Sequence, residues 1–130
     1  MRSLPWPIAG KVVTRFGRQQ HPTLGTTFVS NGVVIASAEP SPVCAVANGK
    51  VLYAGEFMSY GNMIVLEHPG DWYTVYGQLL KWDVEKGQVV TKGDAVGTSR
   101  PRAGGGSEAY FELRFYGKST DPLPWMVRQE

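Results

Sequence analysis

Hydrophobic and polar residues alternate along this chain in short runs that are typical of β-strands. Valine, isoleucine, tyrosine and phenylalanine dominate these runs, as they do in strands. No stretch of about ten or more residues has the 3.6-residue period and the caps of an amphipathic helix. The pattern therefore predicts a mostly β fold, a compact antiparallel sheet with little helix. The predicted strands are residues 11–16, 33–37, 43–47, 50–54, 63–68, 72–76 and 108–115.

Turn-forming residues separate the predicted strands. Asn48-Gly49 stands between two of them and favours a hairpin, because both residues tolerate positive φ. Tyr60-Gly61-Asn62 and Pro69-Gly70-Asp71 predict two further turns. Residues 84–90 and 90–96 repeat a pattern of valine, spacer, Lys-Gly, polar residue and apolar residue. This repeat is short, so it indicates a local pair of turns and not a solenoid.

Strand alternation sorts the side chains of residues 108–115 onto two faces. One face is apolar and is expected to join the core: Ala109, Phe111, Leu113 and Phe115. The other is rich in hydrogen-bonding groups: Glu108, Tyr110, Glu112 and Arg114. This polar face fits a groove wall, and it fits equally well a solvated face with a Glu–Arg pair. Earlier in the chain, in residues 72–79, alternation places Thr74, Tyr76 and Gln78 together on one side.

Composition narrows the class of protein. The 130 residues suit one domain, expected to cover 1–130 and to be the C-terminal fragment of a longer protein. A net charge of +2 is too small to indicate nucleic-acid binding. No apolar run reaches the ~18 residues of a membrane span, so direct membrane insertion is not expected, and no signal peptide is recognisable at the start. Cys44 has no second cysteine to pair with and is interpreted as a small buried hydrophobe.

Several of these segments, taken in order, resemble a known family. They are Phe16-Gly17-Arg18, Gly32-Val33-Val34-Ile35, Val46 to Val51, Tyr60-Gly61-Asn62, Thr74 to Leu79, Val84 to Gly97, Tyr110 to Arg114 and Asp121-Pro122. Their order and spacing resemble the LytM-type, or lysostaphin-like, peptidase domain from about Trp6 to Trp125. The resemblance implies a barrel-sandwich-related fold with a groove over its central antiparallel sheet.

The resemblance also assigns positions to a zinc ion and to catalysis, and this chain departs from the family at each. The zinc positions hold Ser30, Val34 and Tyr110, and the catalytic histidine positions hold Gln78 and Glu108. Catalytic zinc wants about three nitrogen or carboxylate ligands and a water. Valine has no donor atom, and neutral serine and tyrosine are poor ligands. We therefore expect no metal, no cofactor and no peptidase activity.

The lost ligands, the Tyr-Phe-Glu-Leu-Arg strand and the Pro-Leu-Pro-Trp ending resemble more closely the EnvC-type murein hydrolase activators. This resemblance implies a periplasmic or cell-envelope pseudoenzyme that takes part in cell division. Its partner would be an N-acetylmuramoyl-L-alanine amidase, received by the vacated groove, with peptidoglycan as a second binding candidate. The expected groove residues are Ser30, Asn31, Tyr76, Gln78, Glu108, Tyr110, Glu112 and Arg114.

Two alternatives stay open beside the activator hypothesis. One is a peptidoglycan-binding module that grips peptide stems without cutting them, or a residual metallo-endopeptidase. The other is a lipoyl or biotinyl carrier, suggested by the Lys-Gly turns. Lys50 has Gly49 and Val51 as neighbours, which is not the Met-Lys-Met or Asp-Lys-Ala setting of a carrier lysine.

Overall fold

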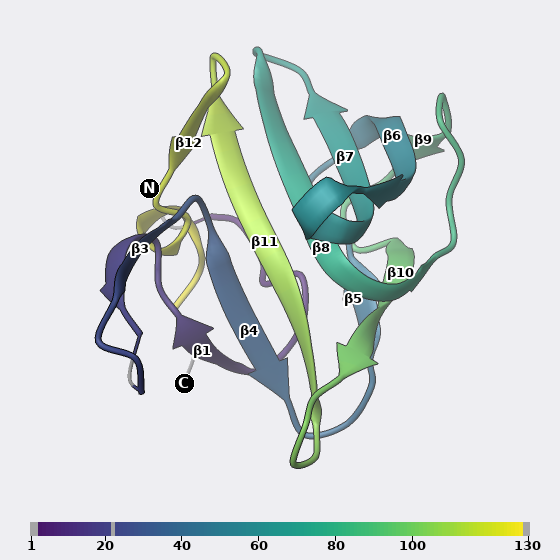
Figure 1. The fold of residues 1–130 in the computed structure, drawn as a ribbon. Coiled ribbons are helices and arrows are strands. Elements are labelled where there is room, and N and C mark those ends of the chain that lie inside the picture. The colour runs from purple at the N-terminus through teal and green to yellow at the C-terminus, as the bar shows by residue number, and fades with distance from the viewer. Residues whose placement is uncertain (1–2, 22, 129–130) are drawn as a thin grey trace.

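Two long neighbouring strands form the centre of the molecule, β8 (Trp72–Trp82) and β11 (Ser107–Phe115). They pair antiparallel, from Tyr110 opposite Gly77 to Phe115 opposite Trp72. The computed structural model describes residues 3–21 and 23–128. In Figure 1 the two strands cross the middle of the sheet side by side.

Eight further strands extend this pair into a ten-stranded antiparallel sheet. On the β11 side lie β4 (Val33–Ser37), β1 (Lys11–Thr14) and β12 (Lys118–Thr120). On the β8 side lie β7 (Gly61–His68), β6 (Gly49–Phe57) and β9 (Val89–Val90). The remaining strand β10 (Ala95–Pro101) pairs with both β8 and β11, and also with β5 (Pro42–Cys44). β1 and β9 are therefore the two end strands of the main path through the sheet.

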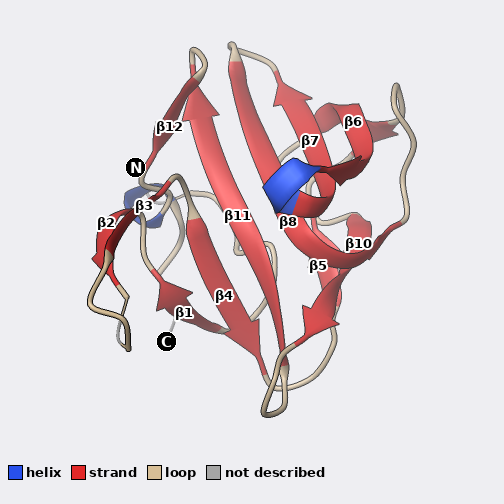
Figure 2. Ribbon diagram, viewed as in Figure 1, coloured by secondary structure: helices blue, strands red, loops and turns tan. Residues whose placement is uncertain are grey.

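Few elements of regular secondary structure lie outside this sheet. A separate hairpin joins β2 (Gly17–Gln20) to β3 (Thr27–Ser30). Two single 3₁₀ turns complete the described residues, η1 (Met58–Tyr60) and η2 (Leu123–Trp125). Figure 2 shows these two turns as the helical segments, among strands and the loops that connect them. The prediction of a mostly antiparallel β fold with little helix is confirmed.

The hydrophobic core lies on one face of β11 and β8. Ala109, Phe111 and Leu113 are almost fully buried, which confirms the predicted apolar face of β11. Phe115 is only half-buried and packs between the rings of Trp72 and Trp125. The core residues of the neighbouring strands include Val33, Ile35, Val51, Ile64, Leu66 and Val96.

The predicted hairpin at Asn48-Gly49 is wrong. The strand before it, β5, pairs with β10, whereas the strand after it, β6, pairs with β7 and β9. The Lys-Gly repeat has a clear structural counterpart, because Gly87 and Gly93 have φ of 90° and 93°. The amide of Gly87 donates to the carbonyl of Val51, and the amide of Gly93 donates to that of Ala45. Long-range pairing thus overrides the local turn signal, while the repeated turns anchor β6 and the segment after β5.

Candidate functional site: a polar groove over the central sheet

A bulge in β8 sets which of its side chains face the groove. Asn62 lies opposite Leu79, but Ile64 lies opposite Tyr76, so β8 advances three residues while β7 advances two. Gln78, within this stretch, has a left-handed φ of 55°. An extra residue in one strand switches the side on which the following residues point. The alternation that placed Tyr76 with Gln78 therefore breaks between them.

Tyr76 consequently lies in the core, and the prediction that it lines the groove is wrong. Its side chain is 0% exposed, and its ring packs 5.4 Å from that of Phe111. The hydroxyl accepts a hydrogen bond from the amide of Val46 at 3.2 Å and is hydrogen-bonded to the Thr74 hydroxyl at 2.9 Å. Burial is the largest cause that raises the pKa of Tyr76 to about 12. It is a structural tyrosine with a satisfied hydroxyl.

Four of the predicted groove residues come together around a cavity of about 260 Å³. It lies between the β2–β3 hairpin, the η1 turn and the central strands. Its lining contains the four predicted residues Ser30, Asn31, Gln78 and Tyr110, together with Phe28, Val29, Ser59 and Tyr60. The Gln78 amide is fixed there by donating a hydrogen bond to the carbonyl of Ser59 at 2.5 Å. The cavity is large enough for one side chain of a partner and too small for a whole helix.

Glu112 is the most constrained polar group beside this cavity. Its side chain is 0% exposed, yet the carboxylate accepts three hydrogen bonds. The hydroxyls of Tyr60 and Tyr110 donate to Oε2 at 2.5 and 2.6 Å, and Nε of Arg114 donates to Oε1 at 2.7 Å. A buried carboxylate is tolerated only when it is paired and hydrogen-bonded in this way. We call Glu112, Tyr60, Tyr110 and Arg114 the groove network.

The electrostatics keep both tyrosines of the groove network as donors. Burial raises the pKa of Tyr110 well above its usual range, and the hydrogen bond and charge of Glu112 raise it further. The same causes, in the same order, raise the pKa of Tyr60. A phenol that is held protonated donates a hydrogen bond to a carboxylate but does not offer the phenolate that a zinc ion would prefer.

Tyr60 is the site residue that sequence reasoning missed. It lies on η1, which connects β6 to β7 and folds over the groove face of the sheet, as Figure 1 shows. Its ring centroid lies 5.7 Å from that of Tyr110. Gly77 makes this contact possible, because a Cβ there would stand 3.2 Å from Tyr110 and 3.4 Å from Tyr60. The sequence marks Tyr60 only as part of a turn, and no local pattern tells that the turn folds back over the sheet.

Glu108 lies outside the cavity, although it shares a face of β11 with Tyr110. Its carboxylate is paired with Arg102 at 3.1 Å and with Arg100 at 3.6 Å. These arginines come from β10 and from the glycine-rich connection to β11, so Glu108 belongs to the rim. The polar alternation of residues 108, 110, 112 and 114 is correct, but their surroundings differ from one residue to the next.

The residues at the three positions that the resemblance assigns to zinc do not fit the ion. The Ser30 hydroxyl donates to the carbonyl of Gly32 at 2.8 Å, within its own turn. Val34 lies opposite Tyr110 and has no donor atom. The Tyr110 hydroxyl is engaged by Glu112. Residues 3–21 and 23–128 contain no group of three or more His, Cys, Asp and Glu side chains that could hold a metal ion.

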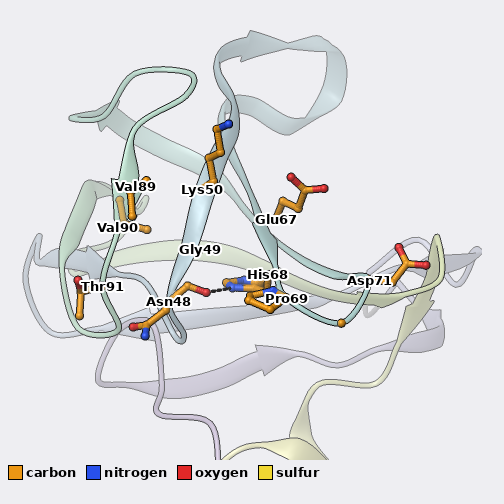
Figure 3. A pocket seen from close by; sticks show the side chains of 11 residues that line it. Asn48, Gly49, Lys50, Glu67, His68, Pro69, Asp71, Val89, Val90 and Thr91 are labelled. Carbon is orange, nitrogen blue, oxygen red and sulfur yellow. Dashed lines mark hydrogen bonds between the residues drawn. The ribbon is translucent and has the colours of Figure 1, made fainter.

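The two histidines have structural partners. His68 is 2% exposed and stacks on Trp72 with ring centroids 4.2 Å apart. It lines a separate, larger cavity of about 680 Å³ between β9 and the β7–β8 turn, shown in Figure 3. His21 accepts hydrogen bonds from the amides of Thr23 and Leu24 through Nδ1.

The hydrogen bonds of His68 define its protonation. Nδ1 lies 2.7 Å from the carbonyl oxygen of Asn48 and must donate to it, since a carbonyl only accepts. Nε2 lies 2.8 Å from the Thr74 hydroxyl. Burial lowers the pKa of His68, although the bond to Asn48 opposes this shift. The ring is therefore neutral near pH 7, with its proton on Nδ1 and with Nε2 in hydrogen-bonding contact with the Thr74 hydroxyl. We call His68, Thr74, Tyr76 and their backbone partners the core network.

The described residues include no helix with the length and apolar character needed to cross a bilayer.

Comparison with curated proteins identifies relatives along nearly the whole chain. It is 30% identical over 125 residues to the murein hydrolase activator NlpD and 32% identical over 124 residues to the murein hydrolase activator EnvC, both of Escherichia coli K12. Each match covers 95% of this chain but only 31% of NlpD and 29% of EnvC. The cell division protein DipM of Caulobacter vibrioides is 30% identical over 112 residues, which are 85% of this chain and 18% of DipM. The chain thus spans less than a third of these relatives.

Solved structures agree with the fold. A zinc containing peptidase from Vibrio cholerae superposes with a TM-score of 0.80 at 25% identity, covering 98% of this chain and 41% of that one. Lysostaphin of Staphylococcus simulans superposes with a TM-score of 0.76 at 25% identity, covering 95% of this chain and 52% of lysostaphin. Residues 28–122, most of the sheet and all of the groove network, match a single family. This chain therefore belongs to peptidase family M23, the family of the LytM-type and lysostaphin-like domains.

Proposed function

We propose that this chain is a non-catalytic activator of N-acetylmuramoyl-L-alanine amidases in cell division, and that it binds the amidase through its groove. The observation that carries the proposal is the groove network. Tyr110 stands at one of the positions that the family resemblance assigns to zinc, and its hydroxyl donates a hydrogen bond to the buried carboxylate of Glu112. The resemblance to NlpD and EnvC supports the same function, since both are named murein hydrolase activators.

The groove network suits recognition of a protein segment. Tyrosine and arginine are enriched at binding hot spots, and they contribute most when they are already held in place. Here Tyr60, Tyr110 and Arg114 are fixed by one carboxylate before any partner arrives. Phe28 and Val29 add apolar rim, being 41% and 67% exposed. A helix or an extended segment of the amidase would insert one side chain into the cavity and lie across the rim.

The same proposal covers location and cofactor. An activator of cell-wall amidases works in the periplasm or cell envelope, where peptidoglycan lies. Two relatives are lipoproteins by name, the NlpD/LppB homolog of Pseudomonas aeruginosa and the outer membrane antigenic lipoprotein B of Haemophilus influenzae, which supports that location. We propose no metal and no other cofactor, because the donor set at the zinc positions does not suit one.

Binding to a purified cell-wall amidase, measured by calorimetry, tests the proposal. Tyr110→Ala and Arg114→Ala should each weaken binding by at least about tenfold, as hot-spot truncations do. Tyr116→Ala is the matched control, because this tyrosine is 75% exposed and does not line the cavity. Absence of binding, or equal binding by all three variants, would contradict the proposal.

Stoichiometric zinc in the purified protein together with cleavage of peptide cross-links would favour an endopeptidase instead. Binding to peptidoglycan but not to amidase would favour a wall-binding module.

A further inference from the structure

Positive charge is concentrated near the beginning of the chain. All 11 Asp and Glu residues lie at position 39 or later, whereas four of the 13 Lys and Arg residues precede that position. The early segment supplies β1, which is an end strand of the main sheet. The net charge of +2 therefore hides a local excess of cations at one edge of the molecule.

A pocket of about 430 Å³ lies at this edge, between β1 and the segment that follows η2. Three cations line it: Lys11, Arg15 and Arg128. Its apolar lining comes from Trp6, Val12, Leu123 and Val127. The register of β1 against β4 shifts between Val12 and Thr14, so Val13 forms a bulge between Lys11 and Arg15. Both flanking cations line the pocket.

The three cations differ from the arginines around the groove. Arg100, Arg102 and Arg114 each form an ion pair with a glutamate. Within residues 3–21 and 23–128, no carboxylate forms an ion pair with Lys11, Arg15 or Arg128. Like charges gathered in one pocket repel each other, and an anionic ligand relieves that repulsion.

Aromatic and aliphatic groups accompany these cations. The indole of Trp6 is anchored by donating a hydrogen bond to the carbonyl of Val127 at 2.8 Å. Val127 and the bulged Val13 are 39% and 43% exposed. Lysine and arginine beside tryptophan and exposed aliphatic side chains are the combination that binds the surface of an anionic bilayer. Three cations are too few to track a nucleic-acid backbone, where affinity grows with the number of phosphates contacted.

We propose that this pocket binds the phosphate of an anionic phospholipid headgroup, and that the β1 edge lies on the membrane surface without inserting into it. This site is separate from the groove, and its failure would leave the amidase proposal untouched. Each Lys or Arg close to an anionic surface strengthens binding about fivefold. Three such residues give about a hundredfold, which orients a protein at a membrane but does not anchor it alone.

Sedimentation with vesicles tests this site. The protein should sediment with vesicles that contain phosphatidylglycerol and stay in solution with vesicles of phosphatidylcholine alone. The triple change Lys11→Ala, Arg15→Ala and Arg128→Ala should weaken sedimentation about a hundredfold. The matched control is Lys50→Ala, Lys86→Ala and Lys92→Ala, which removes the same charge around β9 at the opposite end of the sheet. The control should weaken sedimentation by no more than a few fold.

Two further arms make the outcome decisive. High salt should release the wild-type protein from the vesicles, which requires no variant to fold. Inorganic phosphate should compete with the vesicles, because the pocket is proposed to bind the phosphate group of the lipid. No sedimentation with phosphatidylglycerol vesicles would overturn the proposal. So would an equal loss in both triple variants, since that outcome would show a response to overall charge. Binding of inorganic phosphate without any vesicle binding would also overturn it, leaving a site for a free anion.

Discussion

Two polar networks lie on opposite faces of the same pair of central strands, and they hold different things in place. The core network joins His68, Thr74 and Tyr76 to the backbone of Asn48 and Val46. It therefore fixes the chain between β5 and β6. The groove network joins Glu112 to three side chains, two of which, Tyr60 and Tyr110, line the small cavity. The core network ties backbone to the core, whereas we propose that the groove network presents side chains to a partner.

This difference teaches that burial alone does not locate a functional site. Tyr76 and Glu112 are both 0% exposed. The Tyr76 hydroxyl accepts a hydrogen bond from a backbone amide, so replacement of this residue should affect folding and nothing else. The Glu112 carboxylate accepts hydrogen bonds from Tyr60, Tyr110 and Arg114, so its replacement should affect both folding and recognition.

The largest effect is expected for Glu112→Ala. Removing this fully buried carboxylate deprives the half-buried hydroxyls of Tyr60 and Tyr110 of their acceptor, and leaves Arg114 with its bond to the Gly117 carbonyl but without its ion pair. Breaking a buried pair by deleting one partner costs about 3–5 kcal/mol. Chemical denaturation should show an unfolding free energy lower by about that amount. A loss below about 1 kcal/mol would mean that the network contributes little to folding.

A smaller effect is expected for Tyr76→Phe. The change removes the hydroxyl that accepts from the Val46 amide and bonds Thr74, but it keeps the ring against Phe111. Leaving a buried donor unsatisfied costs about 1–3 kcal/mol. Amidase affinity should stay at the wild-type value, because this side chain does not reach the groove. A fall in affinity comparable to that of Tyr110→Ala would break the distinction between the two networks.

The core network also predicts a pH dependence of stability. The pKa of His68 is lowered in the folded protein, so the unfolded chain binds a proton more readily. Stability contributed by the neutral ring is fully present above the unfolded pKa of about 6.5 and is lost as the pH falls below it toward the folded pKa. Denaturation curves at several pH values should show this loss in the wild type and not in His68→Gln. Parallel pH profiles for the two proteins would contradict the assignment.

The smallest effect is expected for Glu108→Ala. Its ion pairs with Arg100 and Arg102 are partly exposed, the arginine side chains at 46% and 37%. Exposed pairs contribute under about 1 kcal/mol because water and salt screen them. Thermal unfolding should therefore shift little, in contrast with Glu112→Ala. A loss as large as that of Glu112→Ala would show that the rim is as constrained as the groove.

Sequence reasoning recovers the part of this site that depends on regular alternation. Residues 108–115 form an uninterrupted strand, so the apolar and polar faces of β11 are predicted correctly. The prediction for β8 fails at one point. The bulge at Gln78 breaks the alternation, so the side chain of Tyr76 points into the core. A bulge has no reliable signature in a single sequence, because the glycine before it is equally compatible with a regular strand.

Long-range contacts account for the other differences. Asn48-Gly49 has the local chemistry of a hairpin, but β5 and β6 find other partners. Tyr60 reaches the groove only because η1 folds over the sheet and Gly77 leaves space beneath it. Neither the pairing of distant strands nor the fold-back of a turn is encoded in neighbouring residues. Ser30 and Asn31 both line the cavity. That they contact a partner there remains a prediction.

Release of dye-labelled fragments from peptidoglycan by a purified cell-wall amidase tests the central claim most directly. The wild-type domain should raise the amidase rate while releasing nothing by itself, even with zinc added. Tyr110→Ala and Arg114→Ala should abolish most of that increase, and Tyr116→Ala and Tyr76→Phe should preserve it at a temperature where they stay folded. Release of fragments by the domain alone with zinc, or full activation by the two groove variants, would contradict the account.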